Sequence, residues 1–217
     1  TYVGRQGLYF QYRHNAPLSR RIDPGTTNII DIYLVTQAYY IAYQNYVTDS
    51  TGTVPEPAQP TIDELTTSYS TLDQYKMISD NIILNSATFK PLFGTKAAVE
   101  LRATLKCVKN PSSTASVSEI KSQVVSSLNT YFTIDNWDFG DTFFFSELSA
   151  YLHDQLGSII STVVLVPVDP LKSFGDLYEI RSQANEIFVN AATVNDVEII
   201  DALTSSQLRT ASNSGVV

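Results

Sequence analysis

Three aspartates close together are the first candidates for chemistry in this sequence. Asp135, Asp138 and Asp141 flank a tryptophan and a glycine within seven residues. Carboxylates at this density are able to bind calcium, but an EF-hand loop needs ligands at alternate positions and a terminal glutamate. Aspartate and glycine also favour turns, and aspartate near a helix start suits the helix dipole. The pattern therefore favours a turn between two elements, and ion binding is left as an open alternative.

Other residue types used in catalysis are present without a recognisable motif. The chain has two histidines, His14 and His153, and one cysteine, Cys107. It contains no nucleophile elbow, no zinc-binding His-Glu-x-x-His and no phosphate-binding Gly-x-x-x-x-Gly-Lys. Carboxylate pairs such as Asp63 and Glu64 suit glycoside hydrolysis only at the right separation in space. We therefore expect a protein that is not an enzyme and that uses no cofactor and no metal.

Composition restricts the partners. The chain of 217 residues carries a formal net charge of −8, which disfavours nucleic acids and anionic membranes because both are polyanions. The longest apolar stretch, residues 159–168, is far shorter than the roughly twenty residues that a membrane helix needs. Charged residues make up only 17% of the chain, which has 13 tyrosines. Tyrosine suits protein interfaces, so we expect protein partners or a tyrosine-rich core.

Two groups of residues suggest contacts with such partners. Arg20 and Arg21 precede an Asp-Pro-Gly turn, where ion pairing, locally or across an interface, is favoured over phosphate binding. Tyr39, Tyr43 and Tyr46 fall on one helical face, which fits a core stripe as well as a contact surface. The contact residues that we predict are Arg20, Arg21, Tyr39, Tyr43 and Trp137.

Residues 1–94 predict a smaller α+β segment. Period-two alternation indicates strands, and a change to helical spacing follows the second of them. Phe89-Lys-Pro-Leu-Phe-Gly94 punctuates the chain, and we place a domain boundary there. The elements expected are strands at 8–12, 28–36 and 82–84, helices starting at Gln37, at the Thr61–Glu64 capping box and near Ser70, and a mobile proline-rich loop at 49–60.

Residues 95–208 predict the main domain, followed by a tail at 209–217. Strict alternation from Val99 to Cys107 predicts a strand with one covered face, on which Cys107 lies. Ser116 and Glu119 have the spacing of a capping box. Further elements expected are helices at 117–131 and 144–156, a buried strand at 158–168, and short strands at 178–180, 186–189 and 197–203. The fold class predicted is α+β, a two-layer domain with helices packed on one face of a mixed or antiparallel sheet.

The block of residues 116–168 resembles the C-terminal part of J-like baseplate wedge proteins of contractile-tailed phages. An amphipathic helix ending in Tyr-Phe, a glycine-containing turn, a Phe-Ser-Glu-Leu helix, a glycine and a Val/Ile strand follow one another. Earlier segments are similar to the wedge protein of T-even-type phages. The matching segments are Tyr131-Phe132, Asp138-Phe-Gly140, Phe145-Ser-Glu-Leu148, Gly157 and 159–166, with 20–24, 28–36, 75–79 and 89–94 upstream.

The resemblance implies a structural subunit of the tail baseplate, without catalytic residues. In that family, two copies associate within a wedge, and neighbouring wedges join into a ring that changes diameter on tail contraction. The partners implied are the chain itself and other wedge proteins, in a virion assembled in the host cytoplasm. Family members are longer, so this chain would correspond to their C-terminal portion.

Two alternatives remain beside that reading. A host-surface glycan-binding or glycan-cleaving tail component would use aromatic and acidic residues such as Trp137 and Asp138. A calcium-binding module is the third hypothesis and rests on the aspartate cluster.

Overall fold

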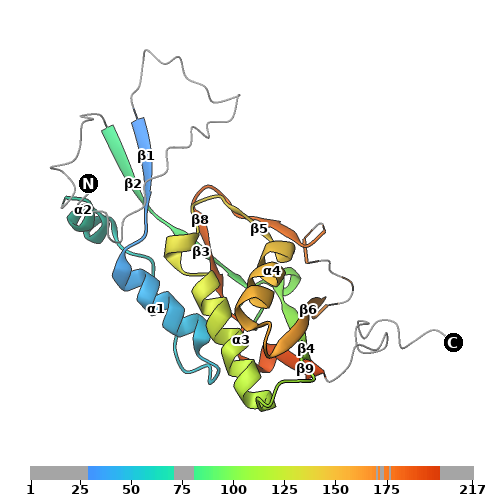
Figure 1. Ribbon diagram of the computed structural model, residues 1–217. Helices are drawn as coiled ribbons and strands as arrows, with labels where there is room; N and C mark the ends of the chain where they lie inside the picture. Colours follow the sequence, from blue (N-terminus) through green and yellow to red (C-terminus); the bar gives the residue numbers. More distant parts are fainter. Residues whose placement is uncertain (1–28, 71–80, 170, 172–173, 176, 201–217) are drawn as a thin grey trace, which may run out of the picture.

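The computed structural model describes residues 29–70, 81–169, 171, 174–175 and 177–200. The described residues have an α+β fold, which confirms the predicted class (Figure 1). The predicted strand at 8–12, the helix near Ser70, the tail at 209–217 and the contact residues Arg20 and Arg21 lie outside the described residues.

One small layer is built on a pair of parallel strands. Strand β1 (Ile29–Leu34) pairs with β2 (Asn81–Ser86), and helix α2 (Ile62–Ser70) covers one face of the pair. The predicted capping box begins α2: the Thr61 backbone N–H donates to Glu64 Oε2 at 2.8 Å, and the Glu64 N–H donates to Thr61 Oγ1 at 3.3 Å. These hydrogen bonds lower the pKa of Glu64. In Figure 1 this layer lies at the upper left, away from β4, β6 and β9.

Helix α1 (Gln37–Thr48) carries the tyrosine stripe into the core. Thr36 caps it, since its Oγ1 accepts from the Tyr39 N–H at 3.3 Å. The ring centroids of Tyr39 and Tyr43 lie 5.2 and 4.6 Å from that of Phe89. The alternative left open by the sequence is thus answered for these two side chains, which are core. Residues 49–60 contain no helix or strand, as predicted, and their mobility stays a prediction.

The main sheet is mixed and has β4 (Ala103–Lys109) at its centre. Strand β6 (Ile160–Pro167) pairs with β4 in antiparallel and β9 (Val197–Ile200) in parallel orientation. Helices α3 (Val117–Tyr131) and α4 (Phe145–Leu156) pack against β9 and β6. Both helices lie beside one another in Figure 1, with the three strands behind and below them. This arrangement confirms the predicted layer of helices on one side of a mixed sheet.

The strand predicted from Val99 to Cys107 begins four residues later than expected. Residues Val99–Leu101 form a turn of 3-10 helix, η3. The turn folds back on Phe93, whose N–H donates to the Leu101 carbonyl at 2.8 Å. Leu101 is buried by this turn while Val99 is exposed. The alternation was misleading because Val99 shares the spacing of the buried residues but is turned to the surface by the 3-10 helix.

Two further strand pairs complete the fold. Strand β3 (Thr88–Leu92) runs parallel to β8 (Glu186–Asn190), and β5 (Thr142–Phe144) runs antiparallel to β7 (Glu179–Arg181). Short 3-10 turns η4 (Ile134–Asn136) and η5 (Val194–Asp196) connect elements. The predicted domain boundary at Gly94 stays a prediction. Described residues on both sides of it nevertheless share one buried cluster, which extends from Tyr39 to Val197.

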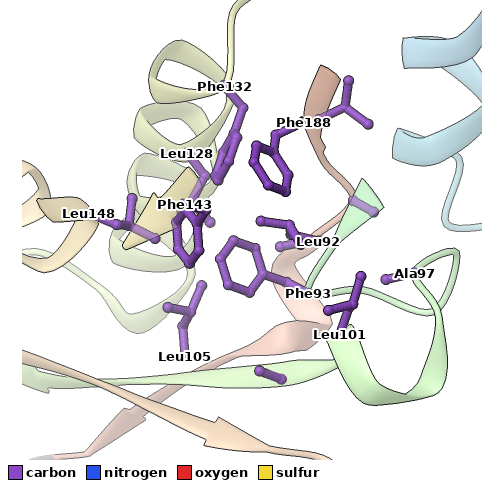
Figure 2. Packing of buried hydrophobic residues seen from close by; sticks show 14 of the residues in the cluster. Leu92, Phe93, Ala97, Leu101, Leu105, Leu128, Phe132, Phe143, Leu148 and Phe188 are labelled. Carbon is purple, nitrogen blue, oxygen red and sulfur yellow. The ribbon is translucent and has the colours of Figure 1, made fainter. Parts of the chain in front are cut away.

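Phe93 lies at the centre of that cluster. Its ring centroid is 6.0, 5.9 and 5.7 Å from those of Phe132, Phe143 and Phe174. In Figure 2 the rings of Phe93, Phe143 and Phe188 point toward one another above the strands. Phe93 has a φ of 78°, a left-handed conformation that a phenylalanine rarely adopts. The next residue is constrained as well: a Cβ on Gly94 would lie 1.8 Å from the carbonyl oxygen of Ala191, so only glycine fits there.

Replacing Gly94 by alanine should destabilise the fold severely. The new methyl group meets backbone atoms that cannot rotate away, so we expect a loss of about 3 kcal/mol or more in the free energy of unfolding. Gly52→Ala is the matched control, because Gly52 has a φ of 72° but open space around it. Backbone strain alone should cost about 1 kcal/mol there. Urea unfolding of both variants measures the difference, and equal losses would contradict the close approach.

Cys107 should make the stability of the protein depend on alkaline pH. The thiol is fully buried, and burial raises its pKa to about 12 from an ordinary 9.0. Above about pH 9 the unfolded chain loses this proton while the folded chain keeps it, so the free energy of unfolding falls as pH rises. We expect a decrease of up to about 1.4 kcal/mol per pH unit from this group.

Comparison with Cys107→Ala isolates that effect. The variant removes a buried side chain and is less stable at every pH, but its stability should change less between about pH 8 and 10. Urea unfolding of both proteins at the two pH values gives the two slopes. Identical slopes would show that the thiol is able to ionise in the folded protein.

Candidate functional site

The aspartate cluster forms the predicted turn. Asp141 Oδ2 accepts a hydrogen bond from the Asp138 backbone N–H at 2.7 Å, and Gly140 adopts a φ of 71°. The Asp141 carbonyl accepts from both the N–H and the hydroxyl of Ser182, at 3.0 and 2.9 Å. The turn therefore joins the end of η4 to the segment after β7. Among the described residues, no group of three acidic, histidine or cysteine side chains is placed to hold a metal ion.

Trp137 is a structural residue of the core. Its indole Nε1–H donates to the Tyr131 carbonyl at 2.9 Å, and its ring stacks on Phe132 with centroids 5.4 Å apart. Trp137, Tyr39 and Tyr43 are each less than a tenth exposed. A partner or a glycan therefore has little surface of these predicted contact residues to touch. The buried position of Trp137 also removes the aromatic platform that the glycan hypothesis assigned to it.

Cys107 and His153, the other two candidate reactive residues in the described chain, have different environments. Cys107 is on the covered face of β4, as predicted, and its raised pKa keeps the thiol protonated at neutral pH. His153 is exposed in the last turn of α4. Neither arrangement activates a nucleophile.

An exposed apolar surface lies where β5 ends and β7 begins. It consists of Phe144, Leu177 and Tyr178, with exposures of 37, 97 and 41%, and we call it the apolar tip. Strand register places Phe144 opposite Glu179, directly after Tyr178. The backbone N–H of Phe145 donates to the Tyr178 carbonyl at 3.2 Å, which fixes the two segments together.

The described residues beside the apolar tip have unusual backbone conformations. Phe174 is buried and stacks on Phe93, which anchors the start of the turn. Gly175 has a φ of 63°, and a Cβ there would lie 2.1 Å from the Glu179 carbonyl oxygen. Leu177 and Tyr178 are also left-handed, with φ of 54° and 60°. Left-handed non-glycine residues cost about 1 kcal/mol each or more, and such strain gathers at functional sites.

Charged residues border the apolar tip. Arg181 and Glu179 point from β7 with 3.8 Å between Nη2 and Oε1, and both are substantially exposed. An apolar centre with a polar rim is the usual anatomy of a protein–protein contact. Sequence reasoning missed this surface, although one signal existed: a leucine and a tyrosine follow the turn sequence Ser-Phe-Gly-Asp, where polar residues are usual.

Among the described residues, every helix is too short or too polar to span a bilayer.

Comparison with known protein families and curated sequences adds no relative from which a site can be transferred. The chain matches no protein-family model and no curated protein sequence.

Proposed function

We propose that this chain is a structural subunit of a phage tail baseplate wedge, whose function is self-association and assembly with other wedge proteins. The observation that carries the proposal is the apolar tip, a strained and anchored turn that exposes Leu177 almost completely. Solvent exposure of a large apolar side chain is unfavourable for an isolated molecule and favourable for one that docks.

The sequence resemblance to baseplate wedge proteins supports the proposal that this association takes place in a phage tail. Part of the resembling block lies within one packed unit: Tyr131 contacts Tyr151 of α4 with ring centroids 5.1 Å apart, and Phe132 and Leu148 belong to the same buried cluster. The same unit supports the apolar tip, because Phe143 of β5 contacts Phe174 with ring centroids 6.2 Å apart. This part of the resembling block and the candidate contact surface therefore share one buried cluster, which suits a protein that transmits movement between neighbours.

The apolar tip is large enough for an anchor but not for a whole interface. A stable interface buries about 800 Å² on each partner, more than three side chains provide. Full burial of a leucine or phenylalanine side chain contributes about 1.5–3 kcal/mol. We therefore propose the tip as the energetic centre of a larger contact, first with a second copy in a two-fold dimer.

Leu177→Asp tests the proposed contact. The charge would be buried without a partner at the interface, so we expect the dimer dissociation constant to rise at least about tenfold. The fold should be unchanged, because Leu177 is exposed and aspartate tolerates a left-handed backbone. Sedimentation velocity over a concentration series measures the association, and thermal unfolding checks the fold.

Ile62→Asp is the matched control for that variant. Ile62 is 72% exposed at the start of α2, so the same change of charge occurs on an exposed apolar residue away from the apolar tip. It should associate like the unmodified chain. Equal association by both variants would contradict the tip as the contact. A chain that stays monomeric alone and when co-expressed with neighbouring tail proteins would contradict the wedge function itself.

A further inference from the structure

A groove separate from the apolar tip lies between α1 and α3. It has a volume of about 330 Å³, at the lower end of the range for small-ligand sites. Both helices pack against β8, and Asn190 at the end of this strand lines the groove. Val47 and Phe132, both almost fully buried, contribute the apolar part of its lining.

The lining is polar and without charge. None of the described residues that line the groove is ionisable, and most carry an amide or a hydroxyl group. Charged ligands such as phosphates and carboxylates are bound by arginine, lysine or backbone N–H clusters, so this lining does not suit them. The amide and hydroxyl residues are Gln44, Asn45, Thr48, Ser126, Asn129, Thr130, Thr133 and Asn190.

Internal hydrogen bonds orient these groups. Asn190 is only 5% exposed; its Nδ2 donates to Asn129 Oδ1 at 2.7 Å, and its Oδ1 accepts from the Ala192 N–H at 2.9 Å. Asn129 thus has its side-chain oxygen engaged, which leaves its amide nitrogen to donate. Asn190 is one of two buried polar residues in the described chain, the other being Ser182.

Hydroxyl groups on the two helices supply the complementary acceptors. Thr48 Oγ1 donates to the Gln44 carbonyl at 2.8 Å, and Thr130 Oγ1 donates to the Ser126 carbonyl at 3.1 Å. Since each hydroxyl proton is used within its helix, the oxygen lone pairs are available as acceptors. Gln44 donates from Nε2 to the Tyr40 hydroxyl at 2.5 Å, so its side-chain oxygen is a further acceptor.

We infer that the groove binds a neutral carbohydrate, of the size of a mono- or disaccharide. Sugar hydroxyls donate and accept at once, which matches a lining of paired amide donors and hydroxyl acceptors. Val47 and Phe132 are almost fully buried beneath this lining, so the contacts to the sugar would be made by the amide and hydroxyl groups. An extended peptide is less suited, because each residue adds about 3.3 Å and the small volume holds only a short segment.

A panel of neutral disaccharides tests the inference: maltose, cellobiose, lactose and N,N′-diacetylchitobiose, each titrated into the full chain to millimolar concentration. We expect at least one to shift the backbone NMR signals of Ser126, Asn129 and Asn190 saturably. Asn129→Ala, which removes the oriented donor, should weaken that binding at least tenfold. Ser126→Tyr, at an exposed position on the groove wall, should abolish it by filling the space.

Asn195→Ala is the control, because Asn195 is exposed in η5 and does not line the groove. It should bind like the unmodified chain. Absence of shifts with all four sugars would overturn the inference, as would binding that survives both groove variants. Binding of N-acetyl-tetraglycine amide at this groove in place of the sugars would overturn it in favour of a peptide ligand. Leu177→Asp should leave sugar binding intact, so the groove and the proposed assembly function fail or succeed separately.

Discussion

The left-handed Phe93 is the constraint on which the rest of the structure depends. Its side chain contacts aromatic rings from α3, β5 and the turn before β7, and its backbone bonds to Leu101 and Ala103. Gly94 must then pass directly over the Ala191 carbonyl. One unusual dihedral angle thus fixes how β3 leaves β8, where β4 begins and where the tip turn is anchored. Such a strained conformation persists only where many surrounding contacts hold it in place.

The abundance of aromatic residues has a different meaning in the structure than in the composition. Tyrosine and tryptophan suit interfaces, but here Tyr39, Tyr43 and Trp137 fill the interior. Burial raises the pKa of Tyr43, with the charges of Glu56 and neighbouring tyrosines as smaller causes. Exposed large apolar residues also occur elsewhere on the described chain, for example Ile62 and Val168. The apolar tip differs from these in that three such residues lie next to one another.

Local sequence signals predicted the elements that local chemistry controls. Ser116 caps α3 as its spacing indicated, with Oγ accepting from the Glu119 N–H at 3.2 Å, and α4 ends at Gly157. The early start assigned to β4 was wrong because Val99–Leu101 form a 3-10 turn, in which Val99 is exposed although alternation predicts that it is covered. The parallel pairing of β3 with β8 could not be predicted from the sequence of either strand, since register between distant strands is decided by the whole fold. The groove escaped notice for the same reason: its amides lie on α1, α3 and β8, which only folding brings together.

The order of the strands also determines when this protein is able to fold. Strand β9 is the edge partner of β4, and β8 is the sole described partner of β3. A ribosome must therefore release the chain up to Pro167 before β4 acquires β6, and up to Ile200 before β3 and the second edge of β4 are paired. Until then β3 and β4 expose apolar faces and unpaired edges, the features that drive aggregation of nascent chains. We expect synthesis of this chain to depend on chaperones that shield its first half until the second emerges.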